Sequence, residues 1–305
     1  MKIITTASDL AQAKALLSIG VDALIIGEAR YGLRLGGYFT LQEMGAAIDY
    51  AHHLGKEVFI AMNAILHNDK IETARPFLKK IKALNPDGLV VGDTGLIQIL
   101  KEEEYQLPYL YDASVLVTSP GQVNFWAKYG AIGAIVAREV PLEELTDMAK
   151  AAEIPLAVQV YGASCIHQSA RPLLTNYFQE VGKDPAELKE HELFLSEPKA
   201  QETHYSIYED EHGTHIFANN DLNLIMHVQK LADLGIGYWY LDGLYTPGQP
   251  FVAIAQRFVQ ARDEILAGSW QDAKALKLDE EIHQLHPKNR ELSTGFFLYD
   301  RDDVQ

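Results

Sequence analysis

Cysteine is almost absent from this chain of 305 residues, because Cys165 is the only one. A single cysteine excludes an internal disulfide and a cysteine-rich zinc site, and it cannot supply the four thiolates of an iron–sulfur cluster. Long apolar runs are absent too, since no stretch approaches the roughly 18–20 apolar residues that span a bilayer. Residues 1–17 lack the apolar core of a signal peptide, so we expect a cytoplasmic protein.

Positive charge is also scarce. The chain has 26 Lys and Arg against 42 Asp and Glu, a formal net charge of −16. This balance disfavours direct nucleic-acid binding unless a local basic patch or a partner protein overrides it, and simple solubility is its plainest explanation. The sequence also lacks a P-loop, a dinucleotide fingerprint, a G-x-S-x-G elbow and H-E-x-x-H, so it predicts no bound metal.

What the sequence does contain is a regular alternation of short apolar segments and amphipathic segments, repeating about every 25–30 residues. Such apolar segments are typical of a parallel sheet covered on both faces. Eight strand–helix units in sequence favour a (β/α)8 TIM-type barrel within the α/β class. An open doubly wound sheet is the alternative, but no G-x-G-x-x-G follows the first strand. The predicted strands are Lys2–Thr6, Ala23–Ile26, Val58–Asn63, Gly88–Val91, Tyr109–Tyr111, Ala134–Ala137, Ala157–Tyr161 and Gly237–Leu241.

Capping residues set the expected helix boundaries. Ser8 is the predicted N-cap of the first helix, and Thr40 with Glu43 forms a capping box for the second. The last helix before the eighth strand is predicted over Asp221–Leu234, with Gly235 after its end.

One connection is far longer than a usual barrel loop. The sequence predicts a barrel domain over residues 1–268 with an insertion at about 162–220, after the seventh strand. Within the insertion, Tyr205–Glu209 and His215–Ala218 flank turn residues and predict a hairpin. The remaining residues, 269–305, are predicted to form a C-terminal tail that docks on the barrel through its final apolar run.

Polar residues that follow the barrel strands should converge on one opening, where barrels of this kind keep their sites. Together they could bind a small anionic or polar ligand. These residues are Glu28, Arg30, Arg34, Asn63, His67, Asn68, Asp93, Asp112, Ser114, Arg138, Glu139, Tyr161, Cys165, His167, Arg171 and Asp242.

Within this set we expect two kinds of role. Asn63, His67 and Glu139 are the catalytic candidates, with His67 as the acid–base group or anion donor. The candidates for ligand binding are Arg34, Asp93, Arg138, Tyr161, Cys165 and Arg171.

Structural roles remain open for several of these residues. Strand ends are polar in every barrel, so Arg138 and Glu139 could form only an ion pair. Asp93 could cap the helix that starts near Gly95, and Asp112 could bond to its own backbone.

Cys165 has two interpretations as well. With His167 it could form a nucleophile and base, provided that the two side chains lie on one face of a strand. A lone cysteine is more often a small buried packing residue.

Residues 157–178, AVQVYGASCIHQSARPLLTNYF, resemble the signature of the collagenase-like peptidases, the thirty-second peptidase family of unassigned mechanism. That signature has Glu and Phe where this chain has Ala157 and Gln159. Further segments resemble the family across nearly the whole chain. They are GEARYGLRLGGYFTLQEM, VFIAMNAILHN, VAREVPLEEL, YEDEHGTHIFANNDLNL and the terminal TGFF.

The resemblance implies a barrel and carries a historical description of the family as proteases. Several members instead hydroxylate the wobble uridine of tRNA with prephenate-dependent chemistry, or hydroxylate quinones, and those members hold an iron–sulfur cluster on four cysteines. Here only the first position matches, as Cys165. The others fall on Pro172, near Lys189 and on Asn223. The chain thus resembles a short branch without its own cluster, of the kind found beside a longer cluster-bearing paralogue.

Three functions follow as hypotheses. The favoured one is an accessory or partner subunit in tRNA wobble-uridine hydroxylation, which forms 5-hydroxyuridine. In it, the paralogue supplies the redox chemistry and contacts tRNA, this chain binds no cofactor alone, and Arg34, Arg138 or Arg171 would bind a prephenate-like anion. The alternatives are a peptidase of unassigned mechanism and a non-catalytic barrel that binds a small anion.

Overall fold

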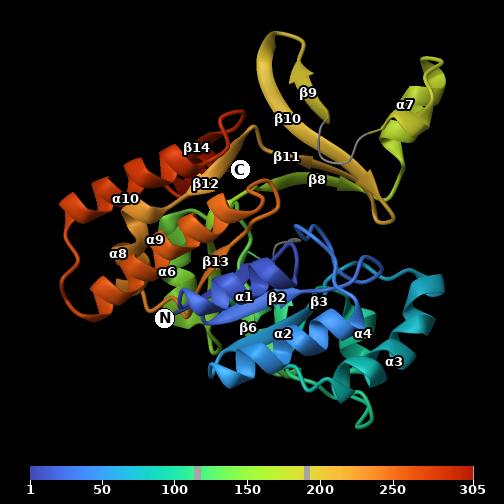
Figure 1. Ribbon diagram of the computed structural model, residues 1–305, viewed down its shortest axis with the longest axis horizontal. Helices are drawn as coiled ribbons and strands as arrows, with labels where there is room; N and C mark the ends of the chain where they lie inside the picture. The colour runs from blue at the N-terminus through green and yellow to red at the C-terminus, as the bar shows by residue number, and fades with distance from the viewer. Residues whose placement is uncertain (113–117, 189–192, 305) are drawn as a thin grey trace.

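Eight parallel strands close into a barrel in the computed structural model, which describes residues 1–112, 118–188 and 193–304 (Figure 1). β13 pairs with both β1 and β7, which closes the ring. The predicted TIM-type fold is therefore confirmed. The barrel strands are β1 (Lys2–Thr6), β2 (Ala23–Ile26), β3 (Glu57–Met62), β4 (Gly88–Val91), β5 (Tyr109–Asp112), β6 (Ala131–Ile135), β7 (Leu156–Gly162) and β13 (Tyr238–Leu241).

Helices cover the outside of the barrel. The predicted capping box of α2 is present, because Thr40 accepts from the Glu43 backbone while the Glu43 carboxylate accepts from the Thr40 backbone. For α1 the predicted cap was wrong by one residue, since Asp9 and not Ser8 caps it. No helix in the described ranges is long and apolar enough to cross a membrane. The helices around the barrel are α1 (Leu10–Ser18), α2 (Leu41–His53), α3 (Asn68–Ala83), α4 (Thr94–Ile99), α5 (Pro120–Ala127), α6 (Leu142–Ala151), α8 (Val228–Asp233) and α9 (Gln249–Leu266).

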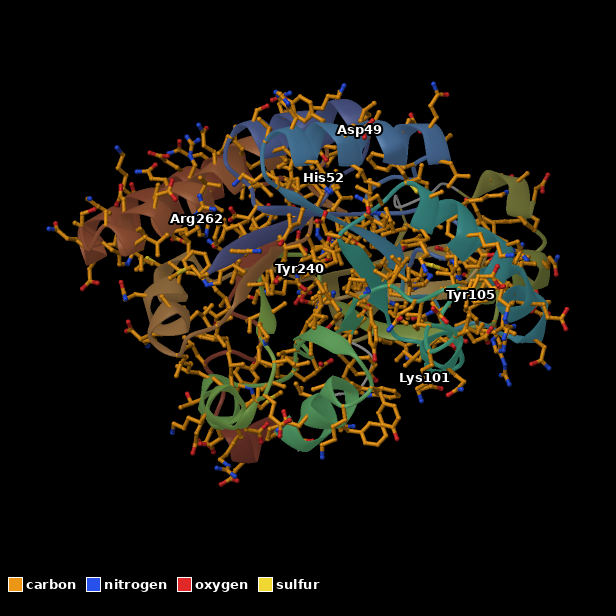
Figure 2. All side chains as sticks on the ribbon, turned by 90° about the horizontal axis from the view of Figure 1, so that it is seen from below. Asp49, His52, Lys101, Tyr105, Tyr240 and Arg262 are labelled. Atoms are coloured by element: carbon orange, nitrogen blue, oxygen red, sulfur yellow. The ribbon has the colours of Figure 1, made fainter. Side chains whose placement is uncertain are left out.

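The barrel interior is filled by side chains and is not a channel. Phe59, Leu110 and Tyr240 belong to a compact apolar cluster drawn from the inward faces of the strands. Tyr240 lies near the centre of the ring, whereas Arg262 lies on an outer helix (Figure 2). Such close packing leaves room for a ligand only at the carboxyl ends of the strands.

The segment before β13 differs from the prediction. The first part of the predicted helix Asp221–Leu234 is a strand, β12 (Asn220–Asn223), which pairs antiparallel with β7. A short 3-10 turn (Ile225–His227) then leads into α8. The polar stretch that resembled a helix start is extended because it pairs on both edges, with β7 and with β14 (Glu291–Ser293).

A second, antiparallel sheet stands over the barrel (Figure 1). The predicted hairpin is confirmed as β10 and β11. Gly162 permits the sharp exit from β7, because its φ is +106° and a Cβ there would lie 2.1 Å from the Asp242 carbonyl oxygen. The second sheet comprises β8 (Cys165–Ser169), β11 (Gly213–Phe217), β10 (Ala200–Asp210) and β9 (Leu193–Glu197), with α7 (Leu173–Glu180) and a 3-10 turn (Pro185–Glu187) beside it.

The tip of the β10–β11 hairpin docks on the barrel loops. The His212 Nε2 atom lies 2.7 Å from the Ala29 carbonyl oxygen, after β2. Lys70, in the first turn of α3, lies 3.2 Å from the Glu211 carboxylate. These contacts hold the second sheet across the carboxyl-terminal end of the barrel.

The chain after residue 268 contains α10 (Asp272–Leu285), β14 and a final 3-10 turn (Arg301–Val304). α10 packs against α9, and β14 extends the barrel sheet beyond β12. Phe297 is buried in the main apolar cluster, and its carbonyl oxygen accepts from the Leu142 backbone.

A buried ion pair joins these parts. Asp221 accepts from Arg290 at 2.9 Å (Nε) and 2.6 Å (Nη2), and both side chains are almost fully buried. The same guanidinium also donates to the Ser206 hydroxyl in β10 and to the Ala218 carbonyl. It lies 4.5 Å from the centre of the Tyr245 ring. One side chain thus links the tail, β12, the second sheet and the loop after β13.

We predict that Arg290→Met lowers the free energy of unfolding by about 3–5 kcal/mol, because it leaves the Asp221 carboxylate buried without its cation. Urea unfolding followed by circular dichroism measures this change. The control is Arg301→Gln, which removes an exposed pair with Glu143 and should leave the unfolding midpoint unchanged. Equal midpoints for Arg290→Met and the wild type would contradict the assigned role.

Candidate functional site

A small polar cavity lies at the mouth of the barrel. Its volume is about 30 Å³, enough for about one or two water molecules. Polar side chains from the ends of five strands, and from the loops that follow them, line it above an apolar floor. The polar lining residues are Arg34, Asn63, Asp112, Arg138, Tyr240 and Asp242.

Asn63 fixes one wall of the cavity. Its Oδ1 atom accepts from the Leu33 backbone at 2.9 Å, and its Nδ2 atom donates to Asp112 at 2.8 Å. Both bonds are buried, so Asn63 positions the loop after β2 against β5. Its side-chain polar atoms are therefore engaged in structural contacts.

Two guanidinium groups face the cavity, and each is held by a glutamine. Arg34 has a positive φ of 55° and donates to the Gln168 side chain at 2.8 Å, which links the loop after β2 to β8. Arg138 donates through Nε to Gln159 on β7. A positive φ is unfavourable for a residue other than glycine, and such strain is common at sites that hold a side chain in one orientation.

Asp242 and Asp112 balance these cations. Asp242 accepts from the Leu244 backbone at 2.9 Å and from the Tyr240 hydroxyl at 3.1 Å. Burial raises the pKa of Asp242 above its ordinary value, although the Leu244 hydrogen bond and the Arg138 charge oppose the shift. The mouth therefore combines two cations with two carboxylates in a small, water-poor space.

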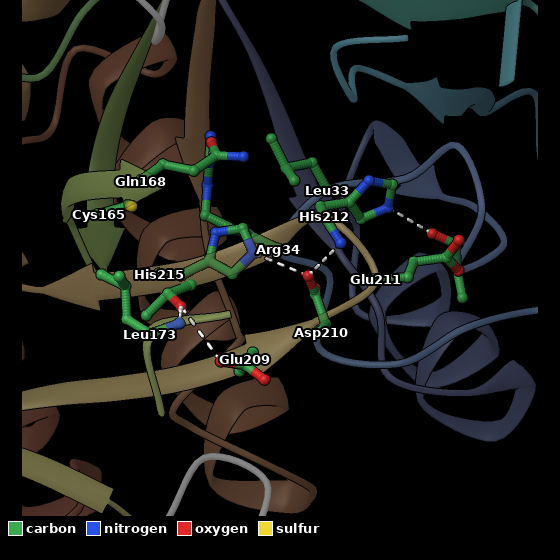
Figure 3. A network of polar contacts seen from close by, with 12 residues as sticks. Leu33, Arg34, Cys165, Gln168, Leu173, Glu209, Asp210, Glu211, His212 and His215 are labelled. Carbon is green, nitrogen blue, oxygen red and sulfur yellow. Dashed lines mark hydrogen bonds and ion pairs between the residues drawn. The ribbon is translucent and has the colours of Figure 1, made fainter. Parts of the chain in front are cut away.

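Above the cavity, the inner face of the second sheet carries a thiol, an imidazole and a carboxylate (Figure 3). His215 Nε2 lies 2.9 Å from the Asp210 carboxylate, and the His215 side chain is fully buried. Cys165 is half-buried on β8, beside the same imidazole. Arg34 lies between this group and the cavity below.

The charges in this layer act on one another. Burial raises the pKa of the Cys165 thiol, but His215, Arg34 and Arg138 outweigh it, so the pKa lies below its ordinary value. Burial lowers the pKa of His215, but the Asp210 carboxylate outweighs it, so that pKa is raised. Both shifts favour transfer of the thiol proton to the imidazole, relative to the two groups in isolation.

The other predicted residues do not line the cavity. His67 is exposed at the N-cap of α3 and makes no side-chain capping bond. Glu139 and Arg171 are exposed, the latter in the bend between β8 and α7. Asp93 caps α4 by accepting from Leu96, which is the structural role left open for it.

Tyr161 also points away from the mouth. Its hydroxyl lies 2.9 Å from Thr246 Oγ1 and 2.7 Å from His286 Nδ1, and the side chain is fully buried. Two predicted positions, Ser114 and Lys189, lie outside the described residues.

From the sequence, His167 was the imidazole nearest to Cys165 and a possible base for it. His167 is exposed, and the buried imidazole beside the thiol is His215. His215 and Asp210 were missed as site residues, although the hairpin that carries them was predicted. Their partner strand β8 was not predicted, so nothing indicated that His215 would lie across from it.

In the described ranges, no three His, Cys, Asp or Glu side chains are grouped as metal ligands would be.

Comparison with known proteins decides the family. The profile of peptidase family U32 matches residues 8–305. The chain belongs to this family. It is 32% identical to tRNA hydroxylation protein P2 of Bacillus subtilis (strain 168), over 97% of both chains.

Two further relatives bear on the comparison. tRNA hydroxylation protein P1 of the same Bacillus strain is 23% identical, and the match covers 79% of this chain but 58% of that longer protein. The solved structure of the U32 peptidase Mk0906 has 16% identity and a TM-score of 0.51, over 79% of this chain and 92% of that one, which supports the fold.

At the positions where the family resemblance expects cluster cysteines, the described residues do not fit four thiolate ligands. Pro172 stands at the N-cap of α7 and has no ligand atom in its side chain. Asn223 is committed to structure, because it donates to Asp279 at 2.8 Å and accepts from the Ile225 backbone. Cys165 is the one thiol among them.

We predict that the free energy of unfolding of Asp242→Asn, relative to that of the wild type, increases as the pH rises above about 4. The pKa of Asp242 is higher in the folded protein than in the unfolded chain, so the folded protein binds more protons between these two pKa values. The free energy of unfolding of the wild type therefore falls as the pH rises through that range. The amide cannot ionise and escapes that loss. Urea midpoints of both proteins at pH 4 and pH 7 test this, and a difference that shrinks with pH would contradict it.

Proposed function

We propose that this chain is an accessory subunit of tRNA wobble-uridine hydroxylation, which forms 5-hydroxyuridine together with a longer, cluster-bearing relative. The observation that carries the proposal is the match to tRNA hydroxylation protein P2 over 97% of both chains. The match thus takes in nearly the full length of that relative.

Support for a partner comes from the contrast with the longer relative. The same Bacillus strain has proteins P1 and P2, and this chain spans 58% of P1 but 97% of P2. With Cys165 as its one thiol, this chain needs redox chemistry from elsewhere. Its net charge of −16 also favours a partner as the subunit that contacts tRNA.

The mouth cavity supports a role in binding a small anion, such as a prephenate-like dicarboxylate. Arg34 and Arg138 are the cations there, and guanidinium groups bind carboxylates in a bidentate manner. A cavity of about 30 Å³ holds water and not an organic acid. Binding would therefore require Gln168 and Gln159 to release the two guanidinium groups.

The test is deletion of the gene in its native host, followed by mass spectrometry of nucleosides from digested tRNA. We expect 5-hydroxyuridine to fall in the deletion strain, because the complex loses a subunit, and to return with the wild-type gene. Arg138→Gln should fail to restore it, whereas the matched variant Arg75→Gln, at an exposed pair with Glu102, should succeed.

Copurification tests the partner directly. A tagged chain should bring down a longer relative that contains iron and acid-labile sulfide. Unchanged 5-hydroxyuridine, both in the single deletion and in a strain that also lacks the longer relative, would contradict the proposal.

A further inference from the structure

The inner face of the second sheet gathers three groups whose chemistry the proposed function does not use. Strand register places them together. Phe217 on β11 pairs with Cys165 on β8. His215 is two residues before Phe217 on the same strand, so the side chains of Cys165 and His215 lie on one face of the sheet. Tyr208 pairs with His215 across β10 and β11, which puts Asp210, two residues further on, on that face as well.

A β-bulge brings the thiol into reach. The register between β11 and β8 shifts between Ile216 and Phe217, so that Cys165 and Gln168, three residues apart, both face inward. Gln168 uses this orientation to accept from Arg34. Cys165 thereby lies on the same face of the sheet as His215 (Figure 3).

The imidazole is oriented from one side and open on the other. Its Nε2 atom lies 2.9 Å from Asp210 Oδ1, which also accepts from the His212 backbone at 2.8 Å. Its Nδ1 atom is buried and meets no nitrogen or oxygen partner within the described part of the chain. The Cys165 thiol lies on the same face of the sheet and acts on this imidazole, while its Sγ atom donates to the His167 carbonyl oxygen at 3.3 Å.

This order of groups is that of an activated nucleophile. A carboxylate fixes the imidazole, and the imidazole takes the proton of the nucleophile. Buried hydrogen-bonding atoms are rarely left without a partner in folded proteins. The open Nδ1 atom beside a thiol is therefore explained if it serves as the proton acceptor.

The charged surroundings favour an anionic reactant. Arg34 and Arg138 both act on Cys165 through their charge, and both line the cavity below it. The other ionisable groups that face this site are His215, Asp210, Tyr245 and Tyr208, whose ring centre lies 4.8 Å from that of His215. A substrate that approaches the thiol through the mouth would place a negative group against the two guanidinium groups.

We propose that Cys165 is a nucleophile with His215 as its base and Asp210 as the positioning residue, and that its substrate is a small electrophile with a carboxylate. In the reaction the thiol proton moves to His215 Nδ1 and the sulfur attacks the electrophilic carbon. A carbon–sulfur bond forms, and the bond to the leaving group breaks, with its electron pair departing on that group.

The experiment measures alkylation of the purified chain by iodoacetate, which is anionic, and iodoacetamide, which is neutral. In both reactions sulfur displaces iodide. Because Cys165 is the sole cysteine, the mass gain of the intact protein reports on it alone. Glutathione serves as the reference thiol.

We expect wild-type protein to react with iodoacetamide at pH 7 on the order of tenfold faster than His215→Gln, because a free thiol is only a few per cent ionised there. The rate profile of the wild type should rise at lower pH than that of His215→Gln. Asp210→Asn should fall between them, since it loosens the imidazole without removing it.

The preference for an anion is tested by the ratio of the two rates. The wild type should favour iodoacetate over iodoacetamide several-fold more than glutathione does, as expected for a site that holds two cations. Arg34→Gln should reduce this ratio, and Arg75→Gln on the outer face of α3 should not. Thermal unfolding of each variant shows that it is folded.

Wild-type protein that reacts no faster than glutathione at pH 7 would overturn the nucleophile, without reference to any variant. An unchanged ratio in Arg34→Gln would overturn the anionic substrate class. Neither result bears on tRNA hydroxylation, because the assay contains no tRNA and no partner protein.

Discussion

The structure depends on a buried pair of opposite charges, Asp221 and Arg290. Removing two ions from water costs several kcal/mol each, so the pair is stable only while both partners and their hydrogen bonds are present. Here the guanidinium is surrounded by a carboxylate, the Ser206 hydroxyl, a backbone carbonyl and the Tyr245 ring. Because these groups come from separate elements, the pair forms only when tail, barrel and second sheet are all in place.

Opposite charges are also paired in the small cavity at the mouth of the barrel. Arg34 and Arg138 are balanced by Asp112 and Asp242, and glutamines hold both guanidinium groups. Gln159 on β7 accepts from the Nε atom of Arg138 and so holds that guanidinium at the mouth. The cavity is therefore polar and small, and the proposed nucleophile, Cys165, lies in the layer above it.

The sequence predicted the barrel well, because buried parallel strands and capped helices have strong local signals. The Thr40–Glu43 capping box and the β10–β11 hairpin were both found from local patterns. The prediction failed at β12, where Asp221 resembles a helix N-cap but pairs with strands distant in the chain. Local propensity does not contain that information, since pairing with β7 and β14 supplies the energy that decides the outcome.

For the site, the sequence alone determined the residue types: one thiol and an excess of carboxylates. It also determined the polar strand ends, from which Arg34, Asn63 and Arg138 were correctly placed at one mouth. Only the tertiary structure decided that His67 lies in solvent, that Tyr161 faces α10, and that His215 meets Cys165. The reason is physical: a side chain's neighbours across a sheet are set by register and bulges, which depend on long-range pairing and not on its own segment.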